Sequence, residues 1–337
     1  MNSDSVLPAG KVPGQLLDRL LRTYRTSPDS SVVVDASYGF DAAAINIGGE
    51  TLLVKSDPIT FATADAATYL VAVNANDIAC MGGIPRWMTV VALLPEGETT
   101  PESVEQQFAD LQLACEHEGV SLIGGHTEIT TGIDRPLLIG TMLGTVGPTG
   151  FLKPGEAKAG HELWLTHSAG IEGTALLAHE KESELRAAVG ESIVAEAKSL
   201  LITPGISVSR DARALLRTGV VTALHDPTEG GVATAIHEIA AASGLGATID
   251  GEAIPVLACT HAITAHFGMN PLGLLSSGSL LIATTPGAET LMNSASVPVT
   301  RIGVLTDTPD GLTISTTGGI QNLPRFDSDE FTRAFVD

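Results

Sequence analysis

One aspartate lies inside an otherwise apolar helical stretch, and it constrains the fold of this chain more than any other residue. The segment YLVAVNANDIACMGGIPRW, residues 69–87, predicts a helix that ends at the glycine pair before the proline. At the helical period, Asp77 shares a face with Leu70 and Val73. Removing a lone carboxylate from water costs several kcal/mol unless a positive group meets it. We therefore expect a cation beside Asp77.

The charge of the chain limits the kinds of partner that it can bind. The chain has 337 residues, enough for two ordinary domains, and a formal net charge of -21. Such an acidic surface repels nucleic-acid phosphates and anionic lipids. We therefore expect neither a nucleic-acid partner nor a membrane partner. An anionic ligand would need a local metal ion or a helix N-terminus.

The cysteines and the apolar stretches bear on the cellular compartment. Cys80, Cys115 and Cys259 form no CxxC pair, which argues against a disulfide framework or a zinc site. The opening MNSDSVLPAGK lacks a positively charged region followed by an apolar one, so we expect no signal peptide. The longest apolar stretch is too short to span a bilayer. We expect a cytoplasmic protein.

Hydrophobic periodicity predicts an α+β fold in two parts, 1–155 and 156–337, divided at the Pro/Gly/Lys-rich stretch 147–162. In the first part, helices are predicted at 14–24, 69–81 and 101–119, and strands at 31–35, 42–48, 51–57, 87–95 and 136–147. In the second part, helices are predicted at 170–180, 191–202, 208–219 and 232–244, and strands at 162–166, 220–225, 277–285, 299–306 and 311–319.

Two further aspartates stand at the ends of predicted elements. Asp41 precedes an apolar run at a glycine turn, and Asp57 ends a strand just before a proline. Each alone is explained by a turn or a cap, but together with Asp77 they would repel one another without a hard cation among them. Mg²⁺ takes oxygen ligands and leaves room for water or substrate phosphates. Lys55 lies on the same strand face as Asp57 and is placed to contact a phosphate.

Three glycine-rich segments carry polar residues, and we expect them to be loops: 123–130, 168–175 and 225–235. Paired glycines before a helix expose N–H groups that hold phosphate oxygens. A helix N-cap at Thr228 explains the last segment equally well. His126 and His225 are as often core or loop histidines as ligands.

At this point the chain resembles a known family. It contains, in this order, GFDAAAI, KSDPITF, NANDIACMGGIPRW, IGGHTEIT, AGIEGTA, HDPTEGGVATAIHEIA and NPLGLLSSGSLLIA. This ordered set resembles the aminoimidazole ribonucleotide (AIR) synthase-like superfamily, which includes AIR synthase, HypE, thiamine-monophosphate kinase and selenophosphate synthetase. The resemblance spans the chain from about residue 30 to residue 305.

The resemblance implies a two-domain fold and a set of site residues. The N-terminal α/β domain would dimerise by completing a β-barrel, followed by a C-terminal α+β domain, with ATP in the cleft between them. The metal ligands implied for Mg²⁺ are Asp41, Asp57 and Asp77. The implied nucleotide-binding residues are Asn74, Asn76, Gly124, Gly125, His126 and Thr127. Asp226, on the side of the second substrate, and Lys55 are the expected catalytic residues.

Departures from the family pattern leave the second substrate open. Phe40 and His126 stand where the family usually has acids, so the site is expected to hold fewer or weaker Mg²⁺ ions. No cysteine follows Cys259, so chemistry on a C-terminal cysteine, as in HypE, is not expected. We expect a homodimeric, ATP- and Mg²⁺-dependent enzyme that phosphorylates an oxygen of a small-molecule or protein substrate. The alternative is a nucleotide-binding partner or regulatory protein without turnover.

Overall fold

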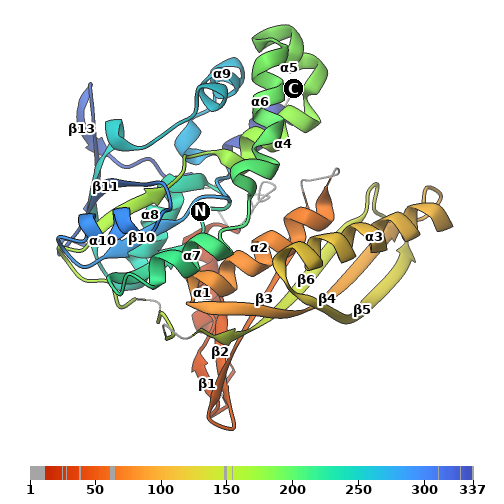
Figure 1. The fold of residues 1–337 in the computed structure, drawn as a ribbon, viewed down its shortest axis with the longest axis horizontal. Helices are drawn as coiled ribbons and strands as arrows, with labels where there is room; N and C mark the ends of the chain where they lie inside the picture. Colours follow the sequence, from red (N-terminus) through yellow and green to blue (C-terminus); the bar gives the residue numbers. More distant parts are fainter. Residues whose placement is uncertain are drawn as a thin grey trace.

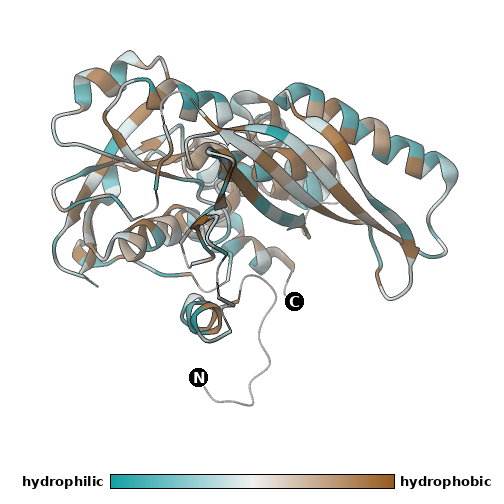
Figure 2. Ribbon diagram, turned by 90° about the horizontal axis from the view of Figure 1, so that it is seen from below, coloured by the Kyte–Doolittle hydropathy of each residue, from teal (hydrophilic) through white to brown (hydrophobic). Residues whose placement is uncertain are grey.

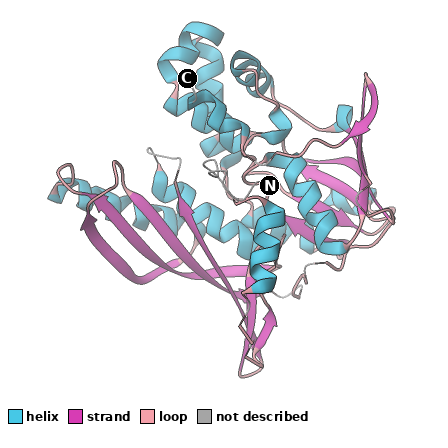
Figure 3. Ribbon diagram, turned by 180° about the vertical axis from the view of Figure 1, so that it is seen from behind, coloured by secondary structure: helices cyan, strands magenta, loops and turns pink. Residues whose placement is uncertain are grey.

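The computed structural model confirms an α+β fold with two β-sheets, which lie at opposite sides of the molecule with helix α2 near its centre (Figures 1 and 3). It describes residues 12–24, 26–27, 29–37, 39–60, 65–147, 150–153, 155–309, 311–326 and 328–335. The start of the chain, on which the expectation of no leader rests, lies outside the described residues. The predicted boundary near residue 155 falls between the two sheets and stays a prediction.

The first sheet has six strands in the order β1-β2-β3-β6-β4-β5. Their bounds are β1 Val32–Val34, β2 Ala43–Ile47, β3 Glu50–Ile59, β4 Gly83–Pro95, β5 Ser121–Thr130 and β6 Leu137–Val146. Neighbouring strands are antiparallel except for the parallel pair β4 and β5. The hairpin between β2 and β3 turns at Gly48 and Gly49, both with positive φ, as a two-residue turn requires. Figure 2 shows hydrophobic residues along the strands of this sheet.

Helix α2, Ala66–Cys80, packs against the first sheet, while α1, Gly14–Thr23, and α3, Pro101–Glu118, complete the first half. Nearly all of α2 is buried, because three apolar clusters share it: one with the first sheet and two with helices and strands of the second half. Gly144 in β6 faces α2, and a Cβ there would collide with Ile78. The helix therefore forms the centre of the molecule and carries Asp77 into its interior.

The second sheet has seven strands in the order β13-β12-β9-β11-β7-β10-β8. Their bounds are β7 Glu162–Thr166, β8 Val221–His225, β9 Gly246–Asp250, β10 Leu281–Thr284, β11 Val299–Thr306, β12 Leu312–Thr316 and β13 Gly319–Asn322. The α-helices of this half are α4 Ile171–Glu180, α5 Glu182–Val189, α6 Glu191–Ser199, α7 Ser209–Leu216, α8 Gly231–Ser243, α9 Ala258–Phe267 and α10 Glu289–Ser294. Strand β8 delivers its last residue, His225, to the cleft beside α2.

The segment 123–130 was expected to be a loop, and this expectation was wrong. It lies within strand β5, at the edge of the first sheet, and pairs in parallel with β4. Gly125 permits this close pairing, because it has a φ of +147° and a Cβ there would collide with the carbonyl oxygen of Val90. Gly125 therefore serves strand pairing instead of a turn.

Candidate functional site

A cavity of about 620 Å³ lies between α2, the first sheet and the loop after β8. All three aspartates that were predicted to converge line it: Asp41 from the segment before β2, Asp57 from β3 and Asp77 from α2. Charged residues that line this cavity include Asp41, Lys55, Asp57, Asp77, His225, Asp226 and Glu238. Convergence of Asp41, Asp57 and Asp77 on one space is therefore a property of the structure.

Lys55 is the positive group beside Asp77. Its Nζ lies 2.9 Å from Asp77 Oδ2 and 3.1 Å from Asp57 Oδ2. Lys55 and Asp57 are two residues apart on β3 and so point to one face of the sheet, against which α2 packs. Burial acts against the charge of Lys55, but the carboxylates of Asp77 and Asp57 outweigh it and raise the pKa of the lysine. Burial raises the pKa of Asp77, and Lys55 opposes that shift.

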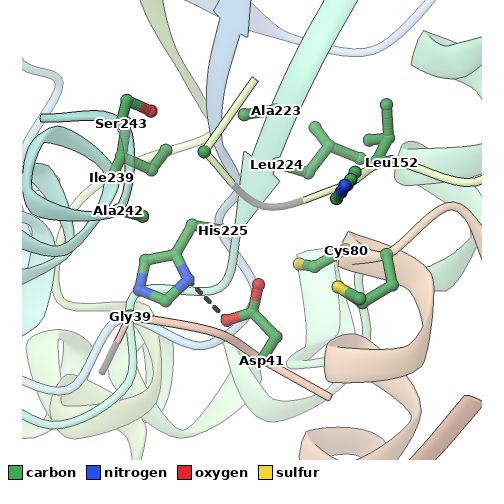
Figure 4. Close-up of a pocket in the computed structure, with 13 residues that line it drawn as sticks. Gly39, Asp41, Cys80, Leu152, Ala223, Leu224, His225, Ile239, Ala242 and Ser243 are labelled. Atoms are coloured by element: carbon green, nitrogen blue, oxygen red, sulfur yellow. Dashed lines mark hydrogen bonds and ion pairs between the residues drawn. The ribbon is translucent and has the colours of Figure 1, made fainter. Parts of the chain in front are cut away.

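A buried histidine occupies the other side of the cavity. His225 Nδ1 lies 2.5 Å from Asp41 Oδ1 (Figure 4). On the other side of the ring, Nε2 lies 2.7 Å from Glu238 Oε2 on α8. Burial would lower the pKa of His225, but the two carboxylates raise it well above its usual value. The protonated ring thus joins Asp41 in the first half to Glu238 in the second.

Asp226, which follows His225, is almost completely buried at the same cavity. Its Oδ2 accepts a hydrogen bond from Asn76 Nδ2 at 2.9 Å, whereas its buried Oδ1 has no hydrogen-bond partner. Burial raises the pKa of this carboxyl to about 8, although the bond from Asn76 opposes the shift. Asp226 is therefore mostly protonated at neutral pH and presents an unused polar atom in a buried position.

The two asparagines that were predicted to bind nucleotide bond to other groups of the protein, and their role in nucleotide binding stays a prediction. Asn74 accepts a hydrogen bond from the backbone N–H of Asp57 and donates to the carbonyl oxygen of Leu70. Asn76 bonds to backbone groups of the second half as well as to Asp226. Both are fully buried, and neither lines the cavity. Their amides hold α2 in place.

The glycine-rich segment that was predicted to bind nucleotide also does not line the cavity of its own chain. Gly124, Gly125, His126 and Thr127 lie on the exposed strand β5, and none of them lines the cavity. His126 Nε2 lies 3.1 Å from Glu128 Oε2 on the same strand. Phe40, in contrast, does line the cavity.

The carboxylate oxygens of the cavity are suitable ligands for Mg²⁺, but they are not arranged to bind a metal ion. Carboxylate oxygens are the ligands that Mg²⁺ prefers. In the part of the chain that the structure describes, however, no three His, Cys, Asp or Glu side chains form a group that could hold a metal ion. Lys55 already pairs with Asp57 and Asp77, and His225 already pairs with Asp41. A metal ion would have to share them with these cations or displace Lys55.

Known proteins resemble this chain over most of its length. The family described as AIR synthase related protein matches residues 39–146 with its N-terminal domain and residues 158–314 with its C-terminal domain. Carbamoyl dehydratase HypE of Rhizobium leguminosarum bv. viciae is 27% identical over 268 residues, which cover 75% of this chain and 72% of that protein.

Solved structures show the same fold. HypE in a crystal structure of the HypE-HypF complex has a TM-score of 0.74 at 19% identity and covers 92% of this chain and 99% of its own. HypE in complex with ATP has a TM-score of 0.70 at 22% identity and covers 94% of this chain and 96% of its own. Among the described residues, no helix has both the length and the apolar character needed to cross a membrane.

Proposed function

This chain belongs to the AIR synthase related protein family, and from that premise we propose that it is an ATP- and Mg²⁺-dependent enzyme that phosphorylates an oxygen of a second substrate. The observation that carries this proposal is the convergence of Asp41, Asp57 and Asp77 on one cavity between the two halves. The ATP complex of HypE, which shares the fold, supports a nucleotide in this family. Such an activity is transferase- or ligase-like.

In this proposal the triphosphate lies on the side of the cavity formed by β3 and α2. Asp57 is the most accessible of the three aspartates, since its side chain is 32% exposed, and with Asp77 and Asp41 it would hold the Mg²⁺ that accompanies the phosphates. The metal would neutralise phosphate charge when bound. Lys55 would contact a phosphate oxygen, because its ammonium group lies at the same end of the cavity.

The acceptor oxygen would lie on the opposite side, next to Asp226. The acceptor oxygen forms a new bond to the γ-phosphorus, while the bond from that phosphorus to the ADP oxygen breaks and ADP leaves. The partnerless Oδ1 of Asp226 is suited to hydrogen-bond the acceptor and, once deprotonated, to take its proton.

Hydrolysis of ATP in the absence of an acceptor tests the enzyme proposal. We expect slow hydrolysis that requires Mg²⁺ and falls at least about a hundredfold in Asp77→Asn. The matched control is Asp211→Asn, because Asp211 also forms a close ion pair, with His167 at 2.7 Å, but does not line the cavity. An unchanged rate in Asp77→Asn would contradict this role.

A second candidate function is nucleotide binding without turnover, as in a regulatory partner. It is favoured by one observation: Lys55 and His225 already form ion pairs with the carboxylates that a catalytic metal cluster would use. Tight binding of ATP with no hydrolysis, and no product with any candidate acceptor, would establish this function instead.

We also propose that the protein is a homodimer formed through strand β5. This strand is an edge of the first sheet, and it exposes Ile123 and Ile129, each by more than half. Exposed edge strands with apolar side chains pair readily with another chain. Pairing of two copies would bring the predicted nucleotide-binding segment Gly124–Thr127 into the interface.

A further inference from the structure

A lysine lies where two carboxylates of the proposed metal site face each other. Lys55 Nζ lies within 3.1 Å of Asp57 Oδ2 and within 2.9 Å of Asp77 Oδ2. The lysine side chain is 22% exposed, and that of Asp77 is 7% exposed. This arrangement is a largely buried ion triad, not a pair of surface charges that solvent would screen.

The geometry leaves one positive charge between two negative ones. A divalent cation bound by two carboxylates would be fully neutralised, whereas the lysine leaves a net charge of about -1 at this point. Asp41 does not add a free carboxylate for a metal ion, because its carboxylate pairs with His225. His225 also contacts Glu238. The lysine and the histidine therefore divide the three aspartates of the proposed metal site between them.

We propose that Lys55 is the resident cation of this site: its ammonium group occupies the space between Asp57 and Asp77 and keeps free divalent cations out of the empty cleft. A metal ion enters only with nucleotide, whose phosphates attract the ammonium group and release the carboxylates to the ion. The exclusion of free metal follows from the ion triad alone. Only the exchange on nucleotide binding rests on the proposed function.

The chain's own side chains make the exchange physically reasonable. Lysine is a point charge on a flexible stem with four carbons, so its ammonium group can move several ångströms without a change in the backbone. Lys55 lies on β3, which pairs with β6 at Lys55 itself and with β2 up to the preceding residue, Val54, so the strand itself is fixed. Asp77 is held in the buried helix α2. The movable partner of the triad is therefore the lysine.

Binding of Mn²⁺, measured by electron paramagnetic resonance in the absence of nucleotide, tests the exclusion. Mn²⁺ is the probe because it takes the same oxygen ligands as Mg²⁺. We expect binding no tighter than about millimolar in the wild type and at least about tenfold tighter in Lys55→Met, since the substitution removes the competing charge. The double variant Lys55→Met/Asp57→Asn is expected to lose this gain, which would locate the ion.

Lys198→Met is the matched control. Lys198 Nζ also forms a close pair with a carboxylate, at 2.6 Å from Glu182 Oε2, but neither residue lines the cavity. This variant is expected to bind Mn²⁺ as the wild type does. A folded Lys55→Met that gains no affinity for Mn²⁺ would overturn the proposal.

The wild type alone provides a second test, which holds even if Lys55→Met fails to fold. We expect Mn²⁺ to bind with at least about tenfold higher affinity when a non-hydrolysable ATP analogue is present. Micromolar Mn²⁺ binding without nucleotide that disappears in Asp57→Asn would overturn the exclusion. If the analogue does not bind at all, the proposed function fails, while a gain of Mn²⁺ binding in Lys55→Met still supports the resident lysine.

Discussion

Asn76 donates a hydrogen bond to Asp226 over 2.9 Å, and this contact ties the central helix α2 to the loop after β8. The same amide accepts from the backbone N–H of Val208 at 2.8 Å and donates to the carbonyl oxygen of Ile206 at 2.9 Å. All three partners belong to the second half of the chain, and Asn76 is completely buried. The Asn76 side chain thus helps to fix the position of the second half against α2.

Replacement of Asn76 by alanine is expected to destabilise the protein by about 3 kcal/mol, because it leaves buried polar groups without partners. Thermal unfolding measures the loss, and Asn322→Ala, at an exposed position on β13, is the control. If the two variants unfold at the same temperature, Asn76 does not join the two halves.

Replacement of His225 by glutamine is expected to cost about 3–5 kcal/mol, because Asp41 and Glu238 would then face each other without a charge between them. Adding Asp41→Asn to this variant should restore part of the stability. The control is His161→Gln, since His161 is also buried but bonds to the hydroxyl of Thr222. Equal melting temperatures for the single and double variants would show that the two carboxylates do not interact through His225.

The buried carboxyl of Asp226 predicts a pH dependence of stability. Its pKa is raised from 3.8 to about 8 in the folded protein, so the folded state retains a proton that the unfolded state has lost. The resulting stabilisation is complete below pH 3.8 and is lost as the pH rises towards 8, by up to about 1.4 kcal/mol per pH unit. Asn cannot titrate, so the melting temperature of the wild type should fall relative to Asp226→Asn between pH 5 and pH 8. A difference in melting temperature between the two proteins that stays constant over this pH range would show that the carboxyl titrates normally.

The proposed dimer predicts that a charge on the exposed edge strand separates the copies. Ile123→Glu is expected to shift the protein from dimer to monomer in sedimentation velocity, because like charges would meet across the interface. Ile320→Glu, on the exposed strand β13 of the second sheet, is the control and should leave the dimer intact. Sedimentation of the wild type as a monomer at micromolar concentration would refute the dimer.

Local patterns predicted the central helix and the convergence of the aspartates. An isolated carboxylate among apolar residues identified Asp77, and the same signal is present at Glu238 in the run IHEIAAA, where sequence reasoning overlooked it. The pairing of Lys55 with Asp77 and of His225 with Asp41 depends on which elements meet across the cavity. Sequence spacing carries no information about those distances.

Strand β5 shows why the rest could not be predicted. Its glycines indicate a loop when only neighbouring residues are considered, whereas its ladder is formed with β4, more than 30 residues earlier in the chain. The contacts of Asn74 and Asn76 within the protein could not be predicted for a related reason. An amide suits a nucleotide and a buried backbone group equally well, and only packing decides which one it meets.

Isothermal titration with a non-hydrolysable ATP analogue and Mg²⁺ tests the central claim most directly, namely that the aspartate-lined cleft binds a triphosphate. We expect micromolar binding by the wild type and at least about thirtyfold weaker binding by Asp57→Asn, with little change in melting temperature, because this accessible carboxylate serves the ligand and not the fold. Equal affinity in the two proteins, or a large loss of ligand-free stability in Asp57→Asn, would contradict the account.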